Sequence, residues 1–256
     1  MTTDRQAKIL QYLAGHGELE VAQLSQLLRV SSSTVRRELT VMEENGLLVR
    51  THGAAQLPTP IHYEPTYESR AAQQTQAKRN IAAAARKLVE PGMVVGISGG
   101  TTCTELARQL RVVEHITIVT NAVNIALELQ GHLDKRVIVT GGVLNHGSYE
   151  LVGHQVVQSL QNVHLNLAFL GASGVDLEFG FSMADEPEAV AARAFMAASE
   201  RTLVLADHTK IGRARFARLC PLTEVSMLIT DDQTSPERCQ ALKQAGLEVL
   251  VAASIV

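Results

Sequence analysis

The sequence predicts an α/β protein in which a small helical domain with a β-hairpin precedes a larger domain built on a mostly parallel sheet. Three observations lead to this expectation. Apolar residues recur at helical spacing up to residue 45, proline and glutamine then gather, and short β-branched runs finally alternate with helix-length segments. We therefore expect a helical domain over residues 1–57, a linker over 58–76 and an α/β domain over 77–256.

Length and composition are those expected of a cytoplasmic globular protein that has one ordinary domain and a smaller one, or a single large α/β domain. The chain has 256 residues, whereas a typical domain has roughly 150. Apolar residues make up 46% of the chain, but no apolar run approaches the ~18 residues that span a bilayer, so we expect no membrane segment and no secretory signal. The three cysteines lie far apart without a CxxC spacing, which argues against a disulfide framework and a structural zinc site. The net charge of -3 argues against a protein that coats nucleic acid non-specifically, so any DNA contact is expected to be local.

The first 45 residues predict three short helices. In each helix the apolar residues recur every three or four positions, which places them on one face. These residues are Ile9, Leu10 and Leu13, then Val21, Leu24 and Leu28, then Val35, Leu39 and Met42. Asn45-Gly46 is typical of a helix end. Residues 47–50 and 54–57 flank Thr51-His52-Gly53 and predict two short strands joined by a turn.

After the linker, a series of short β-branched or apolar runs predicts strands. They are residues 94–97, 116–119, 137–140, 167–170, 203–205, 227–230 and 249–251. Helix-length segments separate these runs, so the strands are expected to lie in a mostly parallel sheet with helices on both faces.

The third helix carries a polar and basic face opposite its apolar stripe. Arginine can donate two hydrogen bonds to guanine or to a phosphate, and hydroxyls at the start of a helix can bind phosphates or base edges. In the hairpin, Arg50 and His52 would lie where a wing reaches the DNA backbone or the minor groove. The candidate contacts to double-stranded DNA are Ser31, Ser32, Ser33, Thr34, Arg36, Arg37, Thr40, Arg50 and His52.

The two arginines could instead belong to a solvated helix face. Arg36 and Arg37 would then pair with neighbouring acids, which are Glu38, Glu43 and Glu44. Basic and acidic residues balance over the first 56 positions, so charge alone does not separate a solvated face from a DNA-binding one. An isolated Arg-Arg pair favours the solvated face, whereas the complete pattern favours DNA binding.

These residues resemble the winged helix-turn-helix of the DeoR family of bacterial transcription regulators, whose usual form is VSxxTIRRDL…GxLxRxHGG. The matching stretches are Val30–Leu39, Gly46–Arg50 and His52-Gly53. Glu38 replaces the usual Asp, and Ala54 replaces the second Gly. The resemblance implies that the third helix reads operator DNA and that the hairpin is the wing.

Polar or glycine-rich segments directly follow several predicted strands. Because the carboxyl ends of parallel strands share one edge, these segments are expected to meet in a crevice. The segment Ser98–Thr102 also begins a helix, so its N–H groups, its hydroxyls and the helix dipole predict a phosphate cradle. Lys210 is expected to supply a compensating cation there, and Asp207 and Asn121 are expected to hold ligand hydroxyls. The candidate ligand contacts are Ser98, Gly99, Gly100, Thr101, Thr102, Asn121, Gly171, Ser173, Asp207 and Lys210.

Some of these segments are equally compatible with a purely structural role. Glycines after a strand can mark only a tight turn, and this applies to Gly141-Gly142 and to residues 171–174. The spacing lacks both GxxxxGK[ST] and GxGxxG, so neither ATP nor NAD is expected, and no cofactor is predicted. The nine histidines form no HExxH pattern, so no metal site is expected. Cys103 begins a helix without an obvious base nearby in sequence, and we expect it to be a small buried residue.

The same segments are similar to the DeoR-family effector domain, whose fold is similar to ribose-5-phosphate isomerase and glucosamine-6-phosphate deaminase. The family motifs DxGTT, TN, GG…LVG, FLGAxG and DxSKxG are matched by residues 98–102, 120–121, 141–142 with 151–153, 169–174 and 207–212. The resemblance implies a pocket for a phosphorylated sugar or a sugar-derived metabolite. Ser98 stands where the family usually has Asp, which removes a carboxylate from the mouth of the phosphate loop.

Two functions from different classes are compatible with these patterns. The first is a transcriptional regulator, normally a repressor in this family, that controls a carbohydrate-catabolism operon. A phosphorylated sugar would release it, and a homo-oligomer, dimer or tetramer, would match palindromic half-sites. The second is a sugar-phosphate isomerase or deaminase with an accessory DNA-binding domain. Such chemistry needs a carboxylate near the phosphate loop. Residues 170–173 contain none where the related isomerases carry a DGADE-like loop, and the nearby acids are Asp185 and Glu186, so we expect no enzyme.

Overall fold

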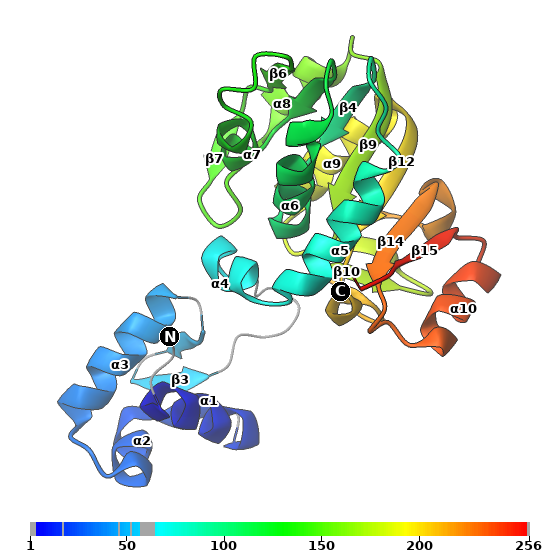
Figure 1. The fold of residues 1–256 in the computed structure, drawn as a ribbon. Helices are drawn as coiled ribbons and strands as arrows, with labels where there is room; N and C mark the ends of the chain where they lie inside the picture. The colour runs from blue at the N-terminus through cyan, green and yellow to red at the C-terminus, as the bar shows by residue number, and fades with distance from the viewer. Residues whose placement is uncertain (1–3, 17, 46, 52, 57–64, 255–256) are drawn as a thin grey trace. The chain divides into compact units, whose positions relative to one another are not determined.

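The computed structural model describes residues 4–16, 18–45, 47–51, 53–56 and 65–254. The chain divides into two units, Met1–Ser69 and Arg70–Val256 (Figure 1). The division falls inside the stretch 58–76 that is expected to be a linker, where helix α4 (Tyr67–Ala72) and the first residues of α5 (Thr75–Arg86) also lie. No helix in the described ranges is long and apolar enough to cross a membrane.

The described part of the first unit contains helices and a small antiparallel sheet with the strand order β1-β3-β2 (Figure 1). The helices are α1 (Asp4–His16), α2 (Val21–Leu28) and α3 (Ser32–Glu44), and the strands are β1 (Glu18–Glu20), β2 (Val49–Thr51) and β3 (Ala54–Gln56). The predicted apolar stripes of the helices meet in one core, which includes Ile9, Leu24 and Leu39. The predicted helices and hairpin are therefore confirmed, whereas the sequence did not reveal β1, which buries only Leu19.

Local hydrogen bonds fix the connection between α2 and α3. Arg29 adopts the left-handed conformation with φ 54°, which ends α2. Ser31 then caps α3, because its side chain accepts a hydrogen bond from the Thr34 N–H at 3.3 Å. The cap fixes the residue at which α3 begins, and thus which side chains face away from the core.

The second unit is built on a seven-stranded sheet with the order β15-β14-β12-β9-β4-β5-β6. Every neighbouring pair in this sheet is parallel. The strands are β4 (Val94–Ile97), β5 (Thr117–Thr120), β6 (Arg136–Val139), β9 (Leu165–Gly171), β12 (Ser199–Leu205), β14 (Met227–Asp231) and β15 (Val249–Ala252). Each coincides with one of the predicted runs to within a few residues, so the predicted mostly parallel sheet is confirmed.

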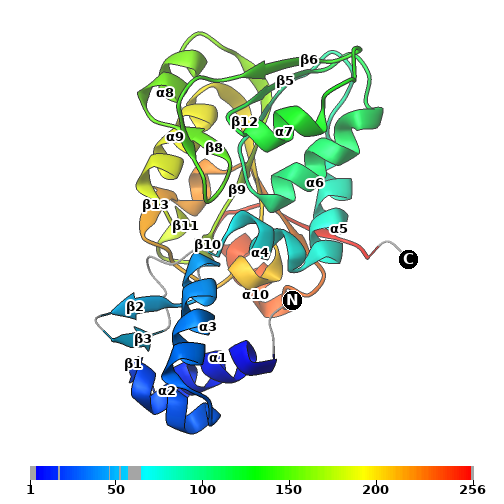
Figure 2. The ribbon, with the colours of Figure 1, turned by 90° about the vertical axis from the view of Figure 1, so that its left-hand side faces the viewer.

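Helices cover both faces of this sheet, as Figure 2 shows for α8 and α9 on one side and α5 to α7 on the other. The further helices are α6 (Thr101–Gln109), α7 (Val123–Glu128), α8 (His154–Leu160), α9 (Glu186–Ala197) and α10 (Pro236–Gln244), with the 3-10 turns η1 (Leu110–Val112), η2 (His208–Lys210) and η3 (Leu222–Glu224). Alternate residues of β9 enter different cores: Phe169 packs in the core with α5 and α6, and Leu170 packs in the core with α8 and α9.

Two small antiparallel sheets complete the second unit. One is the hairpin of β7 (Val143–Asn145) and β8 (Glu150–Val152). The other has the order β10-β11-β13, with β10 (Gly174–Asp176), β11 (Gly180–Met183) and β13 (Ala217–Cys220). The sequence did not predict them, because none of these strands has more than two consecutive apolar residues. The β7-β8 hairpin brings Glu150 next to the end of β5, since Glu150 forms a bridge with Ala122.

Candidate DNA-binding helix and ligand site

The face of α3 that points away from the core carries two arginines that have no partner among the described residues. Arg36 and Arg37 are exposed, and within the described part of the chain their guanidinium groups form no hydrogen bond or ion pair. Two of the acids that would neutralise them have other partners. Glu38 pairs with Arg5 at 3.0 Å, and Glu43 lies 3.8 Å from Arg50. Both arginines are therefore available for an external anion.

Hydroxyl groups surround the N-terminus of the same helix. The Ser31 Oγ lies 2.8 Å from the Ser33 Oγ and 2.9 Å from the Thr34 Oγ1. Ser31 and Ser33 are exposed, whereas Ser32 and Thr34 are half-buried. Hydroxyls and N–H groups at a helix N-terminus favour contact with a phosphate.

The remaining candidate DNA contacts are less free. Arg50 donates from Nη1 to the Thr40 Oγ1 at 3.0 Å, and the Thr40 hydroxyl donates to the Arg36 carbonyl at 2.9 Å. Arg50 thus lies against α3 in the chain as it stands. His52 lies outside the described residues.

In the second unit, four adjacent strands bring candidate ligand residues to one edge of the sheet. The strands β12, β9, β4 and β5 are neighbours in this order, and they lead into Asp207, Gly171, Ser98 and Asn121. Two of these residues are in direct contact, since the Ser98 Oγ accepts a hydrogen bond from the Gly171 N–H at 3.2 Å. The Ser98 hydroxyl, which is buried, therefore ties together the ends of β4 and β9.

The loop between β4 and α6 is open on one side. Gly100 precedes α6 with φ 106°, a conformation that favours glycine, and no side chain caps the helix. A Cβ atom at Gly100 would meet nothing within 4 Å. Thr101 is half-buried and Thr102 is buried. The first N–H groups of α6 are thus placed to receive an anion.

The candidate residues after β9 and β12 have hydrogen-bond partners within the second unit. The Asp207 Oδ1 accepts from the Thr209 N–H at 2.9 Å and caps η2, at the end of which Lys210 is half-buried. The Ser173 N–H donates to the Ser182 carbonyl at 3.0 Å, and the Ser173 carbonyl accepts from the Arg215 Nε at 3.4 Å.

Sequence reasoning missed Lys78, a buried cation beside this edge. Lys78 on α5 is only 4% exposed, and its Nζ donates to the Gln73 carbonyl at 2.6 Å and to the Arg70 carbonyl. Burial lowers its pKa to about 8, an effect that the nearby charge of Asp207 opposes. A lysine in an alanine-rich helix is normally exposed, so no pattern in the sequence signals this role.

Sequence reasoning also missed Glu150, which brings a carboxylate to the loop after β4. Its Oε2 accepts from the Asn121 Nδ2 at 2.9 Å. A Cβ atom on Gly99 would overlap the Glu150 side chain, so these two residues are in close contact. Cys103 is buried, as expected, and burial together with the charge of Glu150 raises its pKa to about 12.

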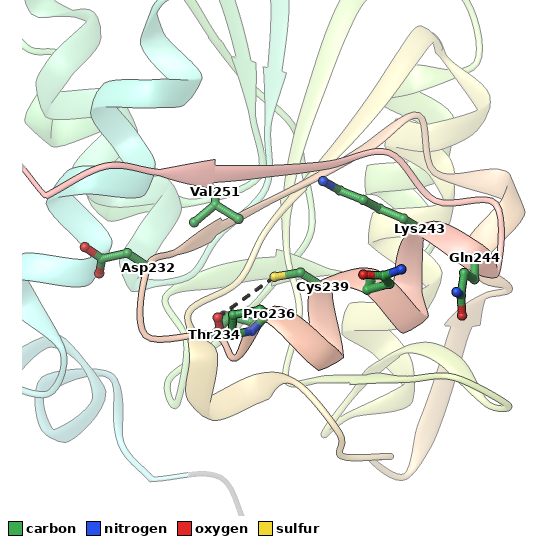
Figure 3. Close-up of a pocket in the computed structure, with 8 residues that line it drawn as sticks. Asp232, Thr234, Pro236, Cys239, Lys243, Gln244 and Val251 are labelled. Carbon is green, nitrogen blue, oxygen red and sulfur yellow. Dashed lines mark hydrogen bonds between the residues drawn. The ribbon is translucent and has the colours of Figure 1, made fainter.

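A separate hollow of about 550 Å³ lies between α10 and β15 (Figure 3). Its lining includes Cys239, whose Sγ faces the Thr234 carbonyl at 4.0 Å, and Lys243. Burial raises the pKa of the Cys239 thiol, which disfavours the nucleophilic thiolate. None of the candidate ligand residues lines this hollow. Among the described residues, no group of three or more His, Cys, Asp or Glu side chains is placed to hold a metal ion.

A helix-turn-helix unit followed by an α/β unit with a polar loop cluster defines a DNA-binding transcriptional regulator with a sensor domain. Residues 5–60 match the DeoR-like helix-turn-helix domain, and residues 73–232 match the DeoR C terminal sensor domain. The chain belongs to the DeoR family.

Curated relatives extend over nearly the whole chain. The putative aga operon transcriptional repressor of Escherichia coli O157:H7 is 34% identical over 98% of this chain and 94% of its own length. The HTH-type transcriptional repressor GlcR of Bacillus subtilis (strain 168) is 31% identical over 97% of this chain and 95% of its own. The HTH-type transcriptional regulator GlpR of Haloferax volcanii is 31% identical over 98% of both chains.

Solved structures that match parts of the chain include an isomerase and a regulator. Ribose 5-phosphate isomerase A from Methanocaldococcus jannaschii is 18% identical with a TM-score of 0.39, and the match covers 52% of this chain and 53% of that one. The probable sor operon regulator from Shigella flexneri is 10% identical with a TM-score of 0.39, over 70% and 91% of the two chains.

Proposed function

We propose that this protein is a cytoplasmic repressor of a carbohydrate-catabolism operon, that α3 binds its operator DNA, and that a phosphorylated sugar releases it. The observation that carries the proposal is the exposure of Arg36 and Arg37, whose guanidinium groups have no partner in the described part of the chain. The names of the relatives support the sign of regulation, since they include an aga operon transcriptional repressor and the transcriptional repressor GlcR. A homo-oligomer, dimer or tetramer, would present two copies of α3 to palindromic half-sites.

The ligand site follows from the charges and donors at the sheet edge. A phosphate would bind the open side of the loop at Gly100–Thr102, where the helix dipole and the free N–H groups favour an anion. Lys78 and Lys210 lie close enough for their charges to interact, and they supply positive charge to the same region. Asn121 offers a buried Oδ1 that has no hydrogen-bond partner among the described residues, and a ligand hydroxyl would satisfy it.

The junction at the start of the second unit offers a way for the ligand to influence DNA binding. Lys78 holds the carbonyl oxygens of Arg70 and Gln73, and the Arg70 Nη2 donates to the Gly147 carbonyl at 3.1 Å. The backbone that leaves the linker is therefore attached both to Lys78 and to the hairpin that carries Glu150. A ligand that changes either contact would shift the balance between DNA-competent and released states.

Fluorescence anisotropy tests the proposal. Labelled DNA from upstream of this protein's own gene is titrated with protein at fixed salt, with and without a pool of pentose, hexose and amino-sugar phosphates. We expect binding that the pool weakens, and division of the pool then identifies the effector. Binding that no sugar phosphate affects would contradict the effector part of the proposal, and the lack of any binding would contradict its operator part.

The isomerase or deaminase alternative calls for a direct assay, because Glu150 places beside the loop a carboxylate that the sequence did not predict. Of the two acids considered from the sequence, Glu186 is exposed, and Asp185 accepts from the Asn145 Nδ2 at 3.3 Å. We expect the protein to bind sugar phosphates without converting them. Turnover of any member of the pool that Glu150→Gln or Glu186→Gln abolishes would contradict this expectation.

A further inference from the structure

We infer that Glu150 determines which ligands this site accepts: its carboxylate receives a hydrogen bond from a hydroxyl or amino group of the sugar and repels free inorganic phosphate. The inference rests on the function proposed above. It adds the chemistry that the effector must present beside its phosphate, namely a hydrogen-bond donor on the sugar.

The backbone holds Glu150 firmly in place. The Leu151 N–H donates to the Asn121 carbonyl at 2.7 Å, the Val123 N–H donates to the Tyr149 carbonyl at 3.0 Å, and the Asn121 Nδ2 donates to the Leu151 carbonyl at 3.0 Å. Tyr149 adopts φ 63°, an uncommon conformation for a residue other than glycine. A fixed side chain of this kind loses little conformational freedom when a ligand binds, which suits it to discriminate between ligands.

The Glu150 side chain divides the phosphate loop into two sides. On one side it fills the space that a Cβ on Gly99 would need, and its Oε1 would lie 2.5 Å from such an atom. On the other side, a Cβ on Gly100 would meet nothing within 4 Å. The carboxylate thus closes the loop at Gly99, and the open side at Gly100 receives the anion.

Charge and hydrogen-bonding capacity then decide what lies against Glu150. A carboxylate only accepts hydrogen bonds, and it repels a phosphate placed next to it. The part of the ligand that faces Glu150 must therefore be a donor and cannot be the phosphate group. A sugar phosphate meets both requirements, because its phosphate occupies the open side while its hydroxyl or amino groups extend toward the carboxylate.

Unsatisfied polar atoms near Glu150 point to the same kind of ligand. Asn121, which binds Glu150, is fully buried, and its Oδ1 has no partner among the described residues. The Ser148 Oγ, two residues before Glu150, is buried and equally lacks a partner in the described ranges. Buried polar atoms are almost always hydrogen-bonded in folded proteins, so these atoms favour a ligand with several donors and acceptors. Glu150 thus supplies a carboxylate beside Gly99 from another element of the unit.

Isothermal titration of the full-length protein separates this role from a structural one. The probes are inorganic phosphate and whichever sugar phosphate of the pool stabilises the wild-type protein most in thermal unfolding. For Glu150→Gln we expect at least tenfold weaker binding of the sugar phosphate and several-fold tighter binding of inorganic phosphate. Glu114→Gln is the control, because it removes the same charge from an exposed residue that precedes β5, at the opposite end of that strand from Asn121. We expect its affinities to equal those of the wild type.

The outcomes distinguish the two levels of the proposal. Suppose that the wild type binds sugar phosphate and that Glu150→Gln binds each probe with the affinity of the wild type. The proposed role of Glu150 is then wrong, and the proposed function stands. If the wild type binds no sugar phosphate, the proposed effector is wrong, and unchanged phosphate affinity in Glu150→Gln also overturns the role of Glu150. If Glu150→Gln does not fold, Glu150→Asp replaces it. Weaker binding of the sugar phosphate with unchanged, weak binding of inorganic phosphate supports the inference. Unchanged affinity for the sugar phosphate contradicts it.

Discussion

Buried charged side chains are the residues on which the ligand site depends. Lys78 and Glu150 are 4% and 8% exposed, and hydrogen bonds compensate each of them: the Gln73 carbonyl accepts from Lys78, and the Asn121 amide donates to Glu150. Burial of a charge without such partners costs several kcal/mol, so these side chains and their partners constrain the local backbone. Burial also lowers the pKa of Lys78, which makes its role accessible to measurement.

Lys78 is predicted to make the stability of the second unit depend on pH. Burial lowers its pKa from 10.5 to about 8, so between these pH values the unfolded chain binds more protons than the folded one. The free energy of unfolding therefore gains a contribution, on the order of 1–3 kcal/mol, as the pH rises from about 8 to 10.5. Below pH 8 the lysine is charged in both states, and the cost of burying it is fully present.

Urea unfolding of the wild type and of Lys78→Met over this pH range checks the prediction. The difference between the two free energies of unfolding should shift in favour of the wild type as the pH rises. Equal pH dependence in the two proteins would show that Lys78 is not the group responsible.

At the scale of elements, α3 shows how far local sequence can predict a surface. The apolar stripe of Val35, Leu39 and Met42 is buried, and the arginines opposite it are exposed. Both facts follow from helical periodicity, which depends only on local spacing. The position of Arg50 against Thr40 depends on how the hairpin packs on α3, which local spacing does not specify.

Removal of both arginines from α3 is expected to abolish specific operator binding. The residual, non-specific binding of Arg36→Ala/Arg37→Ala should depend less on salt, by roughly two counterions, because two arginines that neutralise phosphates are lost. Anisotropy titrations at several salt concentrations measure this slope. The control Arg136→Ala/Arg201→Ala removes the same charge from exposed positions of the second unit and should retain operator affinity. Unimpaired binding by the α3 variant would rule out this helix as the DNA contact.

The central sheet was predictable because each of its strands contains a short apolar or β-branched run, and parallel order follows from the helices between the strands. The gathering of Ser98, Asn121, Gly171 and Asp207 at one edge follows from the same rule. Glu150 was not predictable, because a three-residue strand carries it and only tertiary pairing with Ala122 brings it to Gly99. The ligand contacts of all the candidate residues stay a prediction.

At the scale of the whole molecule, regulation requires that the ligand site and the DNA-binding helix influence one another. Arg70 begins the second unit and donates to the Gly147 carbonyl in the hairpin that carries Glu150. This contact joins the chain leaving the linker to the proposed site without contributing to DNA or ligand contacts of its own.

Arg70→Ala is therefore expected to uncouple the two activities. Operator affinity and sugar-phosphate affinity should each change less than threefold, whereas the weakening of DNA binding by the sugar phosphate should be largely lost. Anisotropy with and without effector measures this weakening, and Arg86→Ala, at the end of α5, serves as a matched control. An effector response like that of the wild type would assign the coupling to other residues.

The most direct test of a sugar-phosphate-controlled repressor is to measure its effector affinity in the presence and absence of operator DNA. Two coupled sites must affect each other by the same factor, so we predict that saturating operator weakens sugar-phosphate binding as much as saturating sugar phosphate weakens operator binding. Typical couplings are on the order of 5- to 150-fold. Effector affinity that is identical with and without operator would contradict regulation by a sugar phosphate, because the two sites would then be independent.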